Sequence, residues 1–208
     1  MLNKPAVRAV TARPWWKKWP VTLRWAGPVL GVVVVIAFGV LAYQRQRHQE
    51  QAEQAAGTYA EVMDALRQDQ AIQALSHAKR LMGQYPRRPE ASLAALATAP
   101  AALALQSHDT ALAQLRFAVA HGKDRGVVAD ATLQLARLLW NDGQLQDALG
   151  LLQDPPKGFE AQFLVLRGDV LLTQGQGQAA REAWDQAMQV TKDPGLRVEL
   201  QQKKAVWP

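Results

Sequence analysis

Nineteen consecutive residues, from Trp25 to Tyr43, carry no charged side chain. As a helix rising about 1.5 Å per residue, this run would reach roughly 28 Å, close to the thickness of the hydrocarbon core of a bilayer. The pattern therefore predicts a transmembrane helix over residues 25–43. It divides the chain into a basic tail, residues 1–24, the membrane helix, and a larger C-terminal region, residues 44–208.

The ends of the apolar run carry aromatic rings, Trp25 on one side and Tyr43 on the other, as is typical of residues at the lipid headgroups. Gly27 and Gly31 form a GxxxG pair that favours close approach of a second helix, although glycine is also common in membrane helices that make no such contact. An alternative interpretation is a signal peptide cleaved near Ala42. The apolar run is longer than the roughly 7 to 15 residues of a signal core, which favours an uncleaved anchor.

Beyond the membrane segment, apolar residues recur at steps of three and four, the period of amphipathic helices. β-branched residues are few there, and alanine and leucine dominate, so the region is predicted to be all-α. The predicted helices cover residues 44–67, 71–84, 90–106, 109–120 and 196–206, together with the two hairpins described next.

Two segments near the C-terminus share one spacing of small, large and turn residues at an offset of 32 positions. The first has Ala136, Leu139, Gly143, Ala148 and Leu152, and the second has Gly168, Leu171, Gly175, Ala180 and Trp184. Small residues let two helices cross closely, large ones fill the gap, and glycine makes the turn, so the pattern indicates helical hairpins that stack on one another. A weaker earlier unit contains Pro100, which is expected to kink or interrupt its first helix.

This spacing resembles the tetratricopeptide repeat, which implies an α-solenoid of about three helical hairpins with the helix at residues 196–206 as a C-terminal cap. The run LRGDVLLTQGQGQAAREAW, from Leu166 to Trp184, follows a basic tail, one membrane helix and an alanine-rich helical region. Together these features resemble the YfgM-like family of ancillary SecYEG translocon subunits. The resemblance implies an inner-membrane protein with a periplasmic repeat domain, partnered by the SecYEG translocon and a membrane-anchored periplasmic prolyl isomerase.

The distribution of charged residues predicts how the chain is oriented in the membrane. The tail and apolar run hold six of the 24 Lys and Arg residues and none of the 18 Asp and Glu residues, so residues 44–208 carry 18 of each and are formally neutral. The positive charge before the membrane helix predicts a cytoplasmic N-terminus and a periplasmic C-terminal domain. A neutral domain lacks the basic footprint of nucleic-acid binding, so no nucleic-acid partner is predicted.

The sequence contains few residues in arrangements typical of catalysis or of metal binding. The chain has no cysteine, and its four histidines are scattered without the spacing of metal ligands. No serine lies in a nucleophile motif, and no glycine-rich segment matches a phosphate loop. We therefore predict no catalytic residue, no metal site and no cofactor, and interpret the protein as a non-enzyme.

Stacked hairpins offer a groove lined by their first helices, and the repeat register places eight residues along it. These are Asp130, Leu133, Arg137, Trp140, Gln162, Val165, Asp169 and Leu172. For Leu133, Val165 and Leu172 a core position is the alternative. Trp140, just before the turn Asn-Asp-Gly, is the candidate anchor for a partner, with structural packing as its alternative.

The sequence thus favours an ancillary subunit of the Sec translocon that binds proteins at the periplasmic exit side and assists the handover or folding of secreted chains. One alternative is a membrane-anchored scaffold for another cell-envelope assembly. Another is a signalling anchor that works through its tryptophan-rich tail.

Overall fold

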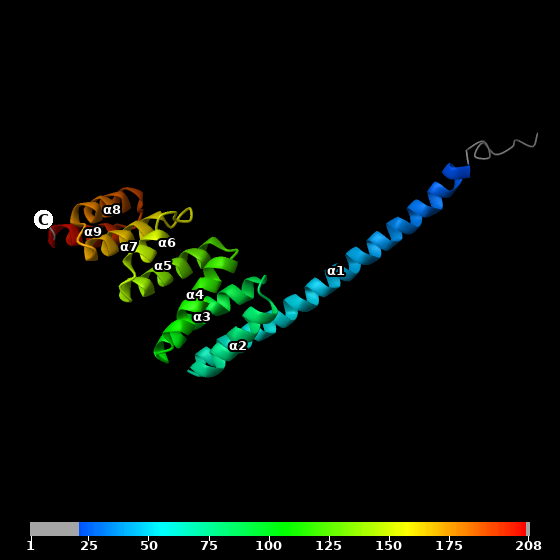
Figure 1. Ribbon diagram of the computed structural model, residues 1–208, viewed down its shortest axis with the longest axis horizontal. Helices are drawn as coiled ribbons and strands as arrows, with labels where there is room; N and C mark the ends of the chain where they lie inside the picture. Colours follow the sequence, from blue (N-terminus) through cyan, green and yellow to red (C-terminus); the bar gives the residue numbers. More distant parts are fainter. Residues whose placement is uncertain (1–20, 207–208) are drawn as a thin grey trace, which may run out of the picture. The chain divides into compact units, whose positions relative to one another are not determined.

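A computed structural model describes the backbone of residues 21–206 and the side chains of residues 37–206. Every regular element in residues 21–206 is an α-helix (Figure 1), which confirms the predicted fold class. The helices of this part are α1 (Val21–Arg67), α2 (Ala71–Gln84), α3 (Pro89–Ala104), α4 (His108–His121), α5 (Arg125–Asn141), α6 (Leu145–Leu151), α7 (Glu160–Thr173), α8 (Gly177–Val190) and α9 (Pro194–Val206).

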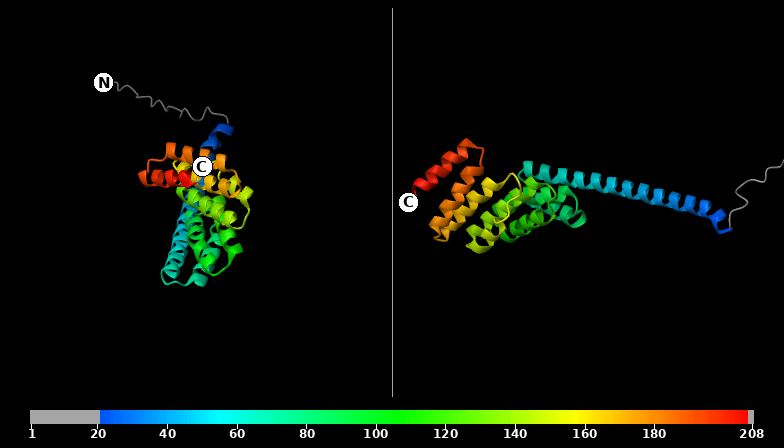
Figure 2. Two further views of the ribbon diagram at one scale, coloured as in Figure 1. Left: turned by 90° about the vertical axis from the view of Figure 1, so that its left-hand side faces the viewer. Right: turned by 90° about the horizontal axis from the view of Figure 1, so that it is seen from above.

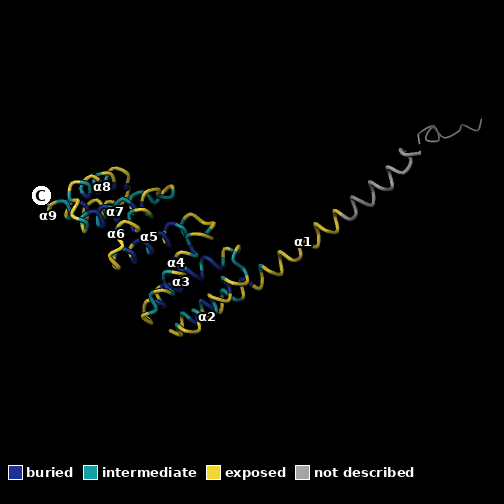
Figure 3. The backbone as a smooth tube through the Cα atoms, viewed as in Figure 1, coloured by how far each residue is buried: buried dark blue, intermediate teal, exposed yellow. Residues whose placement is uncertain are grey.

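Helix α1 contains the predicted membrane segment, residues 25–43, and continues without a break to Arg67. No helix within the part whose side chains are described is long and apolar enough to cross a bilayer. Most of the predicted segment, with Trp25, Gly27 and Gly31, lies outside that part, as does the tail up to residue 20. The residues of α1 that are described before the first hairpin, 37–50, are exposed on every side (Figure 3).

From Gln51 onward the chain forms one compact unit of helical hairpins. Three pairs are the expected ones, α3 with α4, α5 with α6, and α7 with α8. A further pair joins the end of α1 to α2, because Ala55 and Val62 of α1 share a buried cluster with Ala78 and Leu81 of α2. The pairs follow one another as a stack (Figures 1 and 2), which is the predicted tetratricopeptide-like solenoid with one more hairpin than expected.

All four hairpins turn in the same way. One residue in each turn has a left-handed backbone, and the next N–H donates to the carbonyl five residues earlier, the pairing of a Schellman motif. The left-handed residues are Asp69 (φ 57°), Gln106 (φ 56°), Gly143 (φ 75°) and Gly175 (φ 81°). The bonds run from Gln70 to Ala65 (2.8 Å), Ser107 to Ala102 (2.8 Å), Gln144 to Leu139 (2.9 Å) and Gln176 to Leu171 (2.9 Å).

At the crossing of α7 and α8 a glycine lies directly against a tryptophan ring. A Cβ atom added at Gly168 would lie 2.3 Å from Nε1 of Trp184, so no larger residue fits without moving the ring. Trp184 is 1% exposed, and its indole N–H donates to the Val165 carbonyl (3.3 Å) and to Asp169 Oδ1 (3.2 Å). The small residue at 168 and the large residue at 184 therefore meet where the two helices pack.

Two prolines act differently from one another. Helix α3 runs through Pro100 without an interruption, and the proline lies on the exposed side of the helix. Pro155, by contrast, follows soon after the end of α6, which has 7 residues where α4 and α8 have 14. The third hairpin therefore has a shortened second helix.

Helix α9 closes the end of the stack, as predicted for residues 196–206. Leu200 is fully buried in one cluster with Trp184 and Ala187 of α8. Lys204 of α9 pairs with Asp185 of α8, so both apolar and ionic contacts hold the last helix.

Exchanging glycine and glutamine between two equivalent turns is expected to move stability in opposite directions. A left-handed backbone costs a residue with a side chain about 1–2 kcal/mol, and glycine escapes most of that cost. Gln106→Gly should therefore raise the free energy of unfolding of a fragment covering residues 51–208 by about 1 kcal/mol, and Gly143→Gln should lower it by a similar amount. Urea denaturation followed by circular dichroism measures both, and shifts of the same sign would contradict equivalent turns.

Gly168→Ala should destabilise the same fragment by about 1–3 kcal/mol, since the added methyl group displaces the Trp184 ring and its hydrogen bonds. Gly150→Ala, in α6, is the matched control, because a Cβ there meets no atom within 4 Å. That change should be neutral or stabilising by up to about 1 kcal/mol from helix propensity. Denaturation midpoints that shift equally for the two variants would show that the ring does not require the glycine.

Candidate protein-binding groove

The first helices of three successive hairpins, α3, α5 and α7, are neighbours, with α5 in contact with both of the others. Each buries the side that packs on its hairpin partner and leaves the opposite side open. Along α5 the open side repeats at steps of four, three and four through Asp130, Gln134, Arg137 and Asn141, none of which is buried. We call the open sides of α3, α5 and α7 the first-helix face.

On α5 the structure divides the predicted groove residues. Asp130 and Arg137 lie exposed on the first-helix face. Leu133 does not, because it is 6% exposed and belongs to the main core cluster with Leu139 and Phe163. Three residues correspond to a rotation of about 60° from Asp130 around the helix, and the burial of Leu133 supports the alternative of a core position.

Trp140 is half-buried and bridges two hairpins. Its indole N–H donates to Oγ1 of Thr173 on α7 at 3.0 Å, and that hydroxyl in turn donates to the Asp169 carbonyl at 3.1 Å. The ring also packs against the main core cluster. A tryptophan whose N–H is already paired inside the protein serves first as a link between α5 and α7, which corresponds to its alternative as a packing residue.

Helix α9 contacts α7 through an ion pair. Lys203 Nζ lies 2.8 Å and 2.7 Å from the two carboxylate oxygens of Asp169, with both side chains less than one third exposed. Val165 and Leu172 are half-buried against the cluster that includes Leu200 of α9. Only Gln162 of the four predicted residues on α7 is exposed. Of these residues, Asp169 is therefore paired within the protein, with Lys203 of the capping helix.

The sequence analysis placed no groove residue on the open side of α3. This side is apolar, whereas the open side of α5 carries charged residues. The open side of α3 carries Pro100 and Leu103, with Leu103 41% exposed and Leu105, just past the helix, 44% exposed. No charged residue follows Glu90 in α3. The signal was present in the sequence, because PEASLAALATAPAALA is apolar around its whole circumference, more than one buried face requires.

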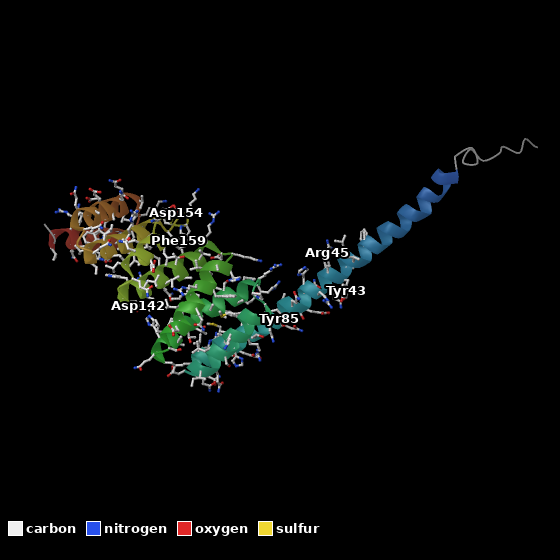
Figure 4. All side chains as sticks on the ribbon, in the orientation of Figure 1. Tyr43, Arg45, Tyr85, Asp142, Asp154 and Phe159 are labelled. Atoms are coloured by element: carbon white, nitrogen blue, oxygen red, sulfur yellow. The ribbon has the colours of Figure 1, made fainter. Side chains whose placement is uncertain are left out.

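Ionisable side chains are dispersed over the described part. His108 Nε2 lies 2.6 Å from Oδ2 of Asp142, beside the turn between α5 and α6 (Figure 4 labels Asp142). Within the first hairpin, His77 Nδ1 of α2 lies 3.1 Å from Glu61 Oε2 of α1. No group of three or more potential metal ligands occurs among the described residues. These pairs join neighbouring helices, which is a structural role.

One carboxyl has a shifted pKa. The backbone N–H of Gly158 donates to Glu160 Oε2 at 2.9 Å and holds the pKa of Glu160 below its usual value. Glu160 lies in the first turn of α7, where a negative charge also favours the helix. The hydrogen bond from Gly158 thus favours the ionised carboxylate of Glu160, whose negative charge stabilises the start of α7.

The chain is similar to known proteins along most of its length. The chain is 26% identical over 196 residues to a protein of Haemophilus influenzae named ancillary SecYEG translocon subunit, covering 92% of this chain and 90% of that one. A protein of Neisseria gonorrhoeae with the same name is 27% identical over 191 residues, covering 89% and 90%. Among solved structures, YrrB, a TPR protein with an unusual peptide-binding site, aligns with a TM-score of 0.53 at 18% identity, covering 71% of this chain and 74% of that one.

The family model of the tetratricopeptide repeat-like domain matches residues 13–205, nearly the whole chain. The structural likeness to YrrB shows the shared fold, and the two relatives confirm the resemblance to the YfgM-like family that the C-terminal motif indicated. The chain belongs to the tetratricopeptide repeat-like domain family.

Proposed function

We propose that this protein is a non-catalytic ancillary subunit of the Sec translocon. The observation that carries the proposal is similarity along about nine tenths of the chain to two proteins that bear this name. A solenoid of stacked hairpins supports it, because such repeats present extended surfaces to other proteins. His77 and His108 pair with Glu61 and Asp142 of neighbouring helices, and the proposal assigns no residue to catalysis.

The proposed anchor is the helix over residues 25–43, with the N-terminus in the cytoplasm and the repeat domain in the periplasm. The Lys and Arg bias before residue 25 supports this orientation. Phe38, Leu41 and Tyr43, at the described end of the segment, are 72%, 54% and 57% exposed. Lipid is the environment that favours so much exposed apolar surface on one helix. The resulting localisation is the bacterial inner membrane.

The first-helix face is the proposed binding surface for proteins at the exit side of the translocon. Its open part is apolar on α3 and charged on α5, where Asp130 and Arg137 are exposed. An apolar patch beside charged residues fits both an emerging secreted chain and a folded partner such as a membrane-anchored prolyl isomerase. In this proposal the protein holds the two together and assists handover or folding.

Site-specific photocrosslinking in native membranes tests the two surfaces separately. A photoreactive residue at Val34 should capture translocon subunits, and one at Arg137 should capture secreted chains or a prolyl isomerase. Glu182, exposed on α8 away from the first-helix face, is the matched control and should capture neither.

Two outcomes of this experiment would count against the proposal. Capture of an unrelated envelope complex from both Val34 and Arg137 would favour the scaffold alternative. Equal capture of secreted chains from Arg137 and Glu182 would show that the first-helix face is not the selective surface.

A further inference from the structure

A group of basic side chains follows the apolar part of α1. Within residues 37–50 the apolar residues end at Tyr43, and Arg45, Arg47 and His48 come soon after it (Figure 4 labels Tyr43 and Arg45). All of these residues are exposed. None of the ion pairs within residues 37–206 involves Arg45, Arg47 or His48. We call these three residues the basic band, which has no acidic partner in the described part of the chain.

Two stripes of exposed side chains lead along α1 from the apolar residues into the basic band. Steps of three and four residues keep the members of a stripe on one side of the helix. The first stripe consists of Phe38, Leu41, Arg45 and His48, and the second consists of Val40, Tyr43 and Arg47. Each stripe changes from apolar to basic within roughly 6 Å along the helix axis. An occupant of either stripe therefore needs hydrocarbon at one end and negative charge at the other.

The arginines of the basic band are directed back toward the apolar residues. The Arg47 guanidinium carbon is 5.0 Å from the centre of the Tyr43 ring, a cation–π contact. Side chains of a helix point toward its N-terminus, so the Arg45 side chain is directed toward Leu41 in the same way. Tyrosine rings at the end of a membrane segment lie among the lipid headgroups. With residues 25–43 as the anchor, the guanidinium of Arg47 lies at the level of the phospholipid phosphates.

Phospholipid matches both halves of each stripe, because its acyl chains are hydrocarbon and its phosphate diester is negative. Guanidinium groups bind phosphate oxygens through paired N–H donors. A free phosphate ion would match only the basic half. A protein partner covers one side of a helix, whereas Arg45 and Arg47, two residues apart, lie on opposite sides of α1. Lipid surrounds a membrane helix, so it reaches both arginines at once.

We propose that Arg45 and Arg47 bind the phosphate groups of phospholipids, with one lipid on each side of α1. The acyl chains lie along Phe38 and Leu41 in the first stripe and along Val40 in the second. This proposal rests on the membrane anchor of the proposed function, and it adds a ligand and the residues that bind it. It requires no contact with the translocon.

The test measures lipid binding to the purified full-length chain in detergent by native mass spectrometry. The two probes are dioleoylphosphatidylglycerol and dioleoylglycerol, which share their acyl chains, and only the first has a phosphate. The natural chain should bind the first about tenfold more tightly, the effect of a charge-assisted hydrogen bond. In the double variant Arg45→Gln, Arg47→Gln the two affinities should agree within about twofold, because glutamine is polar but uncharged. Each single variant should lose one of two tightly bound phosphatidylglycerol molecules.

The double variant Arg87→Gln, Arg116→Gln is the matched control, because it removes the same charge from two exposed arginines of the repeat domain. It should keep the tenfold preference. Inorganic phosphate and a hexaglutamate peptide, each added in excess, should leave the phosphatidylglycerol bound, because neither supplies hydrocarbon. Circular dichroism confirms that each variant is helical.

Several results would overturn the proposal. These are equal affinities of the natural chain for the two lipids, a tenfold preference that survives the loss of both arginines, and loss of the preference in the control. Displacement of the lipid by inorganic phosphate would reduce the basic band to a site for small anions. Displacement by hexaglutamate would instead assign the band to an acidic protein segment.

The same measurements separate this proposal from the proposed function. Equal binding of the two lipids would overturn the phosphate site and leave the membrane anchor standing. Failure to bind either lipid would contradict the anchor as well. Capture of translocon subunits from Val34 is a separate observation that none of these results decides.

Discussion

Close approach between small and large side chains at helix crossings is the constraint on which the repeat domain depends. Gly168 against Trp184 is its extreme case, because the indole occupies the space that any side chain at residue 168 would need. Small buried residues recur in the other hairpins, where Ala78, Ala99 and Ala136 are at most 1% exposed. A solenoid has few long-range contacts, so its stability rests on such local crossings and on the turns that align them.

Helix positions were readable from the sequence because they depend on local periodicity. The limits predicted for residues 71–84 agree with α2, and those of the other helices agree within a few residues. The equivalence of all four hairpin turns could not be predicted from the sequence. Asp69 and Gln106 take the left-handed backbone that Gly143 and Gly175 take more easily, so only two turns carried the glycine signal.

The protein-binding groove on the first helices was harder to predict, because it depends on contacts between residues that are distant in the sequence. Lys203 reaches Asp169 across 34 positions, and that contact pairs a predicted groove residue of α7 with α9. Leu133 and Trp140 likewise belong to contacts between hairpins. What remains open is apolar on α3 and charged on α5, and this division gives the first-helix face two chemically distinct parts for a proposed adaptor.

Quantitative affinity purification tests the central proposal most directly. The full-length chain, tagged at its C-terminus, would be isolated from its own membranes in mild detergent and its companions measured by mass spectrometry. The account predicts enrichment of translocon subunits above all other inner-membrane proteins, with enrichment lost when residues 1–43 are replaced by an unrelated membrane anchor or when the repeat domain is removed. An intact, folded chain that enriches a different envelope complex and no translocon subunit would contradict it.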